Sequence, residues 1–235
     1  MLPKLEFPIH NCIVPSTGQK IQLRPIKVAD EKLLLIAKEA ATVADIYSAV
    51  TQVVNNCIVG GTVDSNKLTL FDIDYIFLKL RSISINNIVS ITYTDPADDN
   101  KQHNFDIDLD KVEVPLQPID KVIKINATTA LTLRYPTGSL YQKIVDQLNS
   151  DTKISNQLIS SCLESIAVGD SVEKFDNYDQ QAIEEFVNNL DVATYQKIQN
   201  FVDAMPSLHY SIDYKDSKDQ PKKLELKSLT DFFTF

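Results

Sequence analysis

The chain has 235 residues, 43% of them hydrophobic, and its 23 basic and 32 acidic residues give a formal net charge of −9. This length and composition predict one or two globular domains with a real core. The acidic balance disfavours nonspecific binding to nucleic acid, which depends on clusters of Lys and Arg. The sequence contains no run of roughly 18 apolar residues, so no membrane span is predicted. The N-terminal MLPKLEFPIHN lacks the apolar segment of a secretory signal.

Cysteine and glycine usage limits the chemistry further. Cys12, Cys57 and Cys162 are an odd, scattered set, which favours a reducing interior over a disulfide framework. Only five glycines occur, which argues against a glycine-rich nucleotide loop. The spacing of Cys and His predicts no zinc site.

The first 27 residues have the pattern of extended structure. Leu5, Phe7 and Ile9 occupy alternate positions, and a second alternating run covers residues 21–23. The turn signal over 15–19 lies between them and predicts a β-hairpin. We call residues 5–9 the arm. The arm either packs on its own domain or reaches a neighbouring chain.

Helical spacing follows the hairpin. Asp30 has the character of an N-cap for a first helix, and residues 44–54 predict a second. A third helix is predicted over 69–83, with Asp72 and Lys79 on a thin polar line between two apolar faces. One face carries Ile73, Ile76, Phe77 and Leu80, and the other carries Leu68, Phe71, Tyr75 and Leu78.

Two apolar faces predict that the helix over 69–83 packs on both sides, because a surface helix needs only one apolar stripe. Either this helix lies at the centre of its own domain, or the face of Phe71, Tyr75 and Leu78 awaits a partner chain.

In the rest of the chain, the spacing of apolar residues alternates between that of strands and that of helices. Strands are predicted over 88–93 and around 105–109, on either side of a polar turn, and again over 121–125 and 130–135. Helical stripes are predicted over 140–148, 158–166, 183–190 and 195–205, with a polar linker over 169–177. A final hairpin is predicted from strands over 208–214 and 224–229. A helix followed by a hairpin is thus predicted twice. The two segments are either a weak repeat of one supersecondary unit or two unrelated hairpins.

These elements predict an α+β fold. It has an N-terminal hairpin and helices, a β-rich middle, and a C-terminal helical unit closed by a β-hairpin. The predicted domains are 1–136, built around the helix over 69–83 and the strands after it, and 137–235.

One acidic run has the chemistry of a cation site. Asp106, Asp108 and Asp110 could place three carboxylates on one strand face, where a hard cation such as calcium or magnesium would bind. Lys111 and Gln117 stand where an EF-hand needs glycine and glutamate. The same alternation is typical of the solvent face of an amphipathic strand. A metal-dependent enzyme that uses these three residues is the alternative of another class.

The chain ends in DFFTF, with Phe232, Phe233 and Phe235 among the last four residues. Fully burying each phenylalanine contributes roughly 1.5–3 kcal/mol. The tail therefore either docks on its own domain or fills a neighbour's groove.

Two long blocks resemble a known family. Residues 30–39, Asn56-Cys57 and the segment LTLFDIDYIFLKLRSIS resemble the T4-type baseplate family of contractile-tailed bacteriophages, which includes baseplate hub and hub assembly proteins. A second block, KIQNFVDAMPSLHYSIDY followed by LTDFF, is similar to the same family. The resemblance covers most of the chain, from about Pro15 to its end.

This resemblance implies a non-enzymatic structural or assembly protein of the tail baseplate hub, with no cofactor. Implied partners are other hub or wedge proteins, or the tape measure protein, in a hetero-oligomeric assembly without nucleic acid or membrane. The implied location is the host cytoplasm during assembly and the baseplate of the virion. A transient assembly chaperone, absent from the mature virion, is the alternative. The residues we expect to contact partners are large and apolar: Phe7, Ile9, Phe71, Tyr75, Leu78, Phe232, Phe233 and Phe235.

Overall fold

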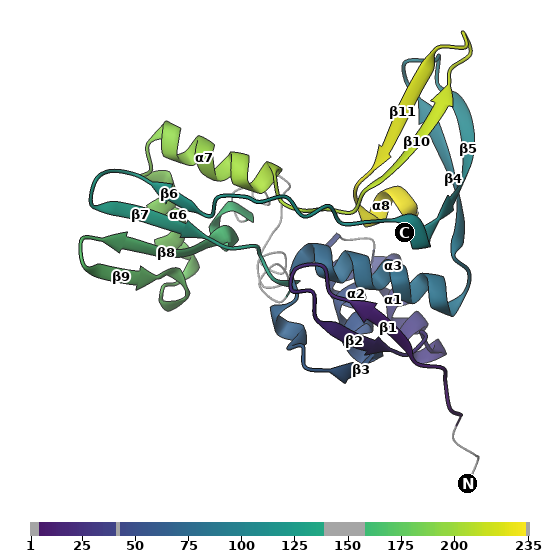
Figure 1. Cartoon of the computed structure of the whole chain (residues 1–235), viewed down its shortest axis with the longest axis horizontal. Helices are drawn as coiled ribbons and strands as arrows, with labels where there is room; N and C mark the ends of the chain where they lie inside the picture. Colours follow the sequence, from purple (N-terminus) through teal and green to yellow (C-terminus); the bar gives the residue numbers. More distant parts are fainter. Residues whose placement is uncertain (1–4, 41–42, 139–157, 234–235) are drawn as a thin grey trace. The chain divides into compact units, whose positions relative to one another are not determined.

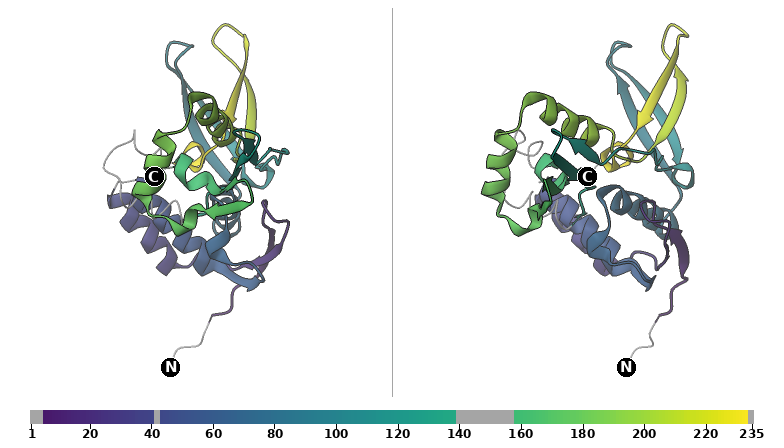
Figure 2. Two further views of the ribbon diagram at one scale, coloured as in Figure 1. Left: turned by 90° about the vertical axis from the view of Figure 1, so that its left-hand side faces the viewer. Right: turned by 60° about the vertical axis from the view of Figure 1, so that its left-hand side comes forward.

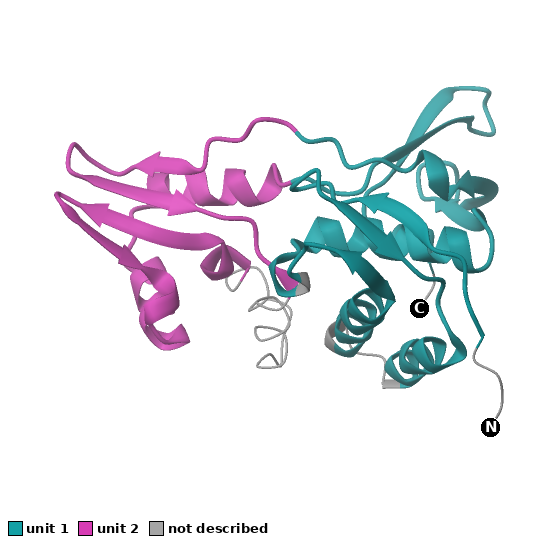
Figure 3. Cartoon of the chain, turned by 60° about the horizontal axis from the view of Figure 1, so that its bottom comes forward, with its two compact units in different colours: residues 1–116, 206–235 teal, residues 117–205 magenta. Residues whose placement is uncertain are grey.

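The computed structural model describes residues 5–40, 43–138 and 158–233 (Figure 1). Its helices and small antiparallel sheets confirm the predicted α+β class. The chain divides into two compact units (Figure 3). Unit 1 contains residues 1–116 and 206–235, and unit 2 contains residues 117–205. This division differs from the predicted boundary between residues 136 and 137, because the last hairpin belongs to unit 1 and the strands over 122–133 belong to unit 2.

Unit 1 begins with the predicted hairpin, which the structure confirms. β1 (His10–Ile13) and β2 (Lys20–Leu23) pair antiparallel, and β3 (Ile58–Gly61) adds to β2. Gly18 has a φ of 68°, the left-handed conformation that glycine adopts without a steric cost, and its N–H donates to the carbonyl of Val14.

Both predicted N-terminal helices are present as α1 (Val28–Ala40) and α2 (Val43–Cys57). The assignment of Asp30 as N-cap was wrong, because α1 begins two residues earlier. The Asp30 carboxylate instead accepts hydrogen bonds from the Lys27 amide at 2.9 Å and from Arg24 Nη1 at 2.7 Å. It therefore ties the first turn of α1 to the end of β2.

The predicted central helix is α3 (Leu70–Ser84), and Thr69 is its N-cap. Thr69 Oγ1 accepts from the Asp72 amide while the Thr69 amide donates to Asp72 Oδ2, which forms a capping box. α3 packs against α2, β1 and the short 3₁₀ turn η2 (Leu109–Lys111). Residues from both predicted faces are buried: Phe71, Ile73, Ile76, Phe77, Leu78 and Leu80. α3 is therefore the central helix of its own unit.

Two hairpins complete unit 1, and both were predicted. The first joins β4 (Ile88–Asp95) to β5 (Lys101–Asp108), and the second joins β10 (Tyr210–Lys215) to β11 (Pro221–Leu226). They lie side by side in both views of Figure 2. The chain then forms the short helix α8 (Leu229–Phe232).

Side chains near the tips join these hairpins across 119 residues of sequence. The hydroxyl of Tyr214 on β10 donates to Asp95 Oδ2 at 2.7 Å. The Ser217 amide and hydroxyl both donate to Asp98 Oδ2, at 2.8 and 2.9 Å. The Tyr214 ring lies 5.6 Å from the ring of Phe105 on β5. These contacts join both strands of the first hairpin, and the turn between them, to the second hairpin.

The described part of unit 2 contains one antiparallel sheet of four strands, a helical segment that ends at residue 162, and two helices after the sheet. The strands lie in the order β6 (Val122–Lys124), β7 (Thr129–Leu133), β8 (Leu163–Val168) and β9 (Ser171–Lys174). The predicted helices over 183–190 and 195–205 correspond to α6 (Gln180–Asn188) and α7 (Val192–Asp203).

Two predictions for unit 2 were wrong. The stripe over 158–166 is helical only to residue 162 and then forms β8, and the predicted linker over 169–177 contains β9. A short apolar run is compatible with either a helix or a strand. Residues 163–168 form a strand because they pair with β7, where Leu131 lies opposite Ile166. The predicted helix over 140–148 lies outside the described residues.

Candidate functional site: protein-binding surfaces

The arm displays apolar side chains on the surface of unit 1. The side chains of Leu5, Phe7 and Ile9 are 77%, 39% and 59% exposed. Lys27 Nζ lies 5.1 Å from the centroid of the Phe7 ring, within the range of a cation–π contact. Three apolar residues at alternate positions leave a strip that a partner could cover.

The predicted contact residues on α3 lie in or against the core of unit 1. Phe71 and Leu78 are buried, with exposures of 4% and 0%. Tyr75 is half-buried and packs against the same core, and Lys79 Nζ lies 5.4 Å from the centroid of its ring. These residues therefore support the fold, which was one of the two alternatives for this face.

The tail also docks on unit 1. Phe232 is only 1% exposed, and the ring of Phe233 meets the ring of Phe77 on α3 edge-on, at 6.0 Å between centroids. The Asp231 carboxylate accepts from the amides of Lys227 and Ser228 and fixes the start of α8. Phe235 lies outside the described residues.

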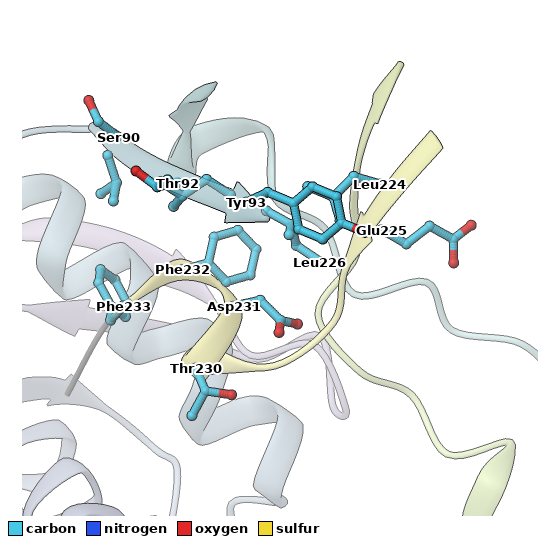
Figure 4. Close-up of a pocket in the computed structure, with 12 residues that line it drawn as sticks. Ser90, Thr92, Tyr93, Leu224, Glu225, Leu226, Thr230, Asp231, Phe232 and Phe233 are labelled. Carbon is cyan, nitrogen blue, oxygen red and sulfur yellow. The ribbon is translucent and has the colours of Figure 1, made fainter. Parts of the chain in front are cut away.

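A groove of about 570 Å³ opens beside the docked tail (Figure 4). It is lined by Val89 to Tyr93 of β4, Leu224 to Leu226 of β11, and Thr230 to Phe233. Figure 4 shows Phe232 between the two strands. Sequence reasoning missed this groove, because it is formed by hairpins far apart in the chain. We call it the β4–β11 groove.

The three acidic residues considered as a cation site have separate partners. Asp106 Oδ1 accepts from Ser90 Oγ at 2.6 Å, and Asp108 Oδ1 accepts from Asn87 Nδ2 at 3.1 Å. Asp110 lies in η2 rather than on the predicted strand, because β5 ends at Asp108. Within the described ranges, no three His, Cys, Asp or Glu side chains are grouped to hold a metal ion.

The three thiols have the environment of structural cysteines. Cys12, Cys57 and Cys162 are free and buried. Burial raises the pKa of Cys12 and of Cys57 to about 11, and that of Cys162 to about 12. Because the thiolate is the nucleophile, these pKa values disfavour thiol chemistry near neutral pH.

One carboxylate in unit 1 should make stability depend on pH. Burial raises the pKa of Asp74 to about 7. The hydroxyl of Tyr47 lies 3.5 Å from Asp74 Oδ1, and this contact offsets only part of the rise in pKa. In the unfolded chain this pKa is about 3.9, so between pH 4 and 7 the folded state alone holds the proton. Since the unfolded state binds fewer protons there, the free energy of unfolding falls as pH rises through this range.

We therefore expect Asp74→Asn to stabilise the protein at pH 8 and to have little effect at pH 4. Each unit of pKa shift corresponds to about 1.4 kcal/mol, and partial solvent exposure reduces the expected gain to about 1–2 kcal/mol. Urea unfolding of both proteins at the two pH values measures it. Exposed Asp64→Asn is the matched control, and an equal gain for Asp74→Asn at both pH values would contradict a raised pKa.

The surfaces of the described residues are those of a protein that binds other proteins: an exposed apolar arm and an open groove between strands. No described helix is long and apolar enough to cross a membrane. The chain matches the family described as T4 bacteriophage base plate protein over residues 7–234, and it belongs to this family. No curated protein and no solved structure shows a significant match.

Family membership confirms the resemblance seen in the sequence. The protein is a baseplate protein of the phage tail, and its role involves other baseplate proteins. The matched segment begins at Phe7, so the exposed side chains of Phe7 and Ile9 lie within it.

Proposed function

We propose that the protein is a non-enzymatic structural component of the baseplate hub that acts through protein–protein contacts. The observation that carries this proposal is the family match over residues 7–234. Its partners are other hub or wedge proteins, or the tape measure protein, which it meets in the host cytoplasm during assembly. The contacts are made by the arm, whose apolar side chains remain exposed in the isolated chain.

Mass spectrometry of purified phage particles tests this role. We expect peptides of this chain at a stoichiometry comparable to that of other baseplate proteins. Their absence from mature particles, together with their presence in assembly intermediates, would instead identify a transient assembly chaperone. A variant with Asp106, Asp108 and Asp110 all replaced by Asn should still support assembly, and its failure despite normal folding would revive the enzyme alternative.

The double variant Phe7→Ala/Ile9→Ala should weaken capture of co-expressed hub proteins at least tenfold. The reason is that exposed apolar side chains contribute when a partner buries them, and a tenfold change corresponds to about 1.4 kcal/mol. The thermal unfolding temperature should not change, since these side chains are exposed in the free protein.

Val192→Ala is the matched control for the arm variant, because Val192 is an exposed apolar residue of unit 2, at 84% exposure. Pull-down with the hub proteins compares the three chains. If the arm variant binds as well as the wild type, or if the control loses as much, the arm is not the contact.

A further inference from the structure

Two strand edges face each other across the β4–β11 groove. Among the described residues, β4 pairs only with β5 and β11 only with β10. No backbone hydrogen bond of the described chain joins β4 to β11. Because residues of β4 and β11 line the groove while those of β5 and β10 do not, the groove runs along the unpaired edges of both hairpins.

The edge of β4 lacks two of the usual protections against pairing. Residues 88–94 read IVSITYT, with no charge and no proline. By contrast, β11 begins with Pro221 and two lysines, and β5 carries Lys101 and Asp106. Exposed edges are normally blunted by charge, proline or a covering segment. An uncharged run of seven residues along an edge is therefore expected to be covered by another strand.

The interior of the groove suits a strand with alternating apolar side chains. Val89, Ile91 and Tyr93 point to the inner side of the β4–β5 sheet and are half-buried, whereas Ser90 and Thr92 are exposed. Leu226 and Phe232, at 4% and 1% exposure, supply apolar surface from β11 and α8. A strand added to β4 would continue this inner face with every second side chain.

Charge and backbone chemistry indicate the occupant. Glu225 and Asp231 are the charged residues of the lining, and both are acidic. Glu225 pairs with Lys227 at 2.7 Å and with Lys223 at 3.7 Å, and neither lysine lines the groove. A neutral or basic segment is thus favoured over an acidic one. The arm of a second copy fits less well, because it carries Glu6 and because Pro8 has no N–H for an edge.

We propose that the β4–β11 groove binds an extended segment of another polypeptide, which adds to β4 as an antiparallel or parallel strand with apolar side chains alternating with neutral or basic ones. This mode of binding is β-strand addition, in which backbone hydrogen bonds supply affinity and pockets for alternate side chains supply specificity. The inference rests on the proposed function, for which it names the chemistry of one partner.

The test uses the full chain and a synthetic heptapeptide, Lys-Val-Thr-Val-Lys-Val-Thr. Calorimetry measures the dissociation constant, and hydrogen exchange reports which amides the peptide protects. We expect saturable binding with slowed exchange in β4. The same peptide methylated at alternate backbone nitrogens should bind at least tenfold more weakly, because it loses its edge hydrogen bonds. Equal affinity for the methylated peptide, no binding, or protection away from β4 would overturn the proposal.

Paired charge reversals test the preference for a basic segment. Glu225→Lys, in the lining, should weaken binding of the basic peptide about fivefold, while Asp213→Lys on β10 should leave it unchanged. Slowed exchange in β4 that grows with protein concentration, without peptide, would make a second copy the occupant and overturn the assignment to another polypeptide. If the chain is present in phage particles but the peptide does not bind, strand addition alone fails and the proposed function stands.

Discussion

Replacing Asp72 by alanine should lower the free energy of unfolding by about 3–5 kcal/mol, because it removes a buried acceptor of several hydrogen bonds. Asp72 is fully buried at the start of α3. Its carboxylate accepts from the amide and hydroxyl of Ser16 at 2.8 and 2.6 Å, and from the amide and hydroxyl of Thr69 at 2.9 and 2.7 Å. The variant leaves these donors without their acceptor and removes the Asp72 side-chain half of the capping box.

Urea unfolding of the wild type and variant measures this loss. Ser16→Ala removes one hydroxyl from the network and should cost about 1 kcal/mol, the usual value for a single hydrogen bond. Asp213→Ala, on the exposed face of β10, should change stability by less than about 0.5 kcal/mol. A loss below 1 kcal/mol for Asp72→Ala would mean that the network contributes little.

The Asp72 network shows where prediction from sequence reached its limit. Apolar spacing predicted α3 within one residue at each end, because local periodicity determines a helix. The same reasoning placed Asp72 only on a thin polar line with Lys79, between the two apolar faces, and did not predict a partner for it. The bond to Ser16 spans 56 residues, and a local pattern contains no information on such a contact.

The same limit applies to the candidate surfaces. Alternation at Phe7 and Ile9 predicted an extended arm, and both side chains are exposed. Predicting the groove would have required knowing that the last hairpin packs beside β4 and β5. That packing depends on long-range contacts such as the one between Tyr214 and Asp95. The sequence could not show whether each apolar face of α3 packs in the core or against a partner, because both kinds of contact use apolar side chains.

The tail offers the sharpest separation of a core residue from an interface residue. Phe232 is 1% exposed, so Phe232→Ala should lower the free energy of unfolding by about 3–4 kcal/mol, through lost apolar burial and the cavity that remains. Phe233→Ala should cost less, because Phe233 is half-buried against Phe77.

Urea unfolding and hub-protein pull-down, on the same variants, distinguish the two roles of the tail. If Phe232 has a core role, Phe232→Ala should lower the free energy of unfolding. Under conditions where the variant remains folded, it should bind hub proteins as the wild type does. A partner role requires the reverse: unchanged unfolding with weakened pull-down, as expected for Phe7→Ala/Ile9→Ala. Because Phe232 also lines the β4–β11 groove, the folded variant should bind the strand peptide more weakly while retaining the protection of β4 amides, since those depend on backbone pairing.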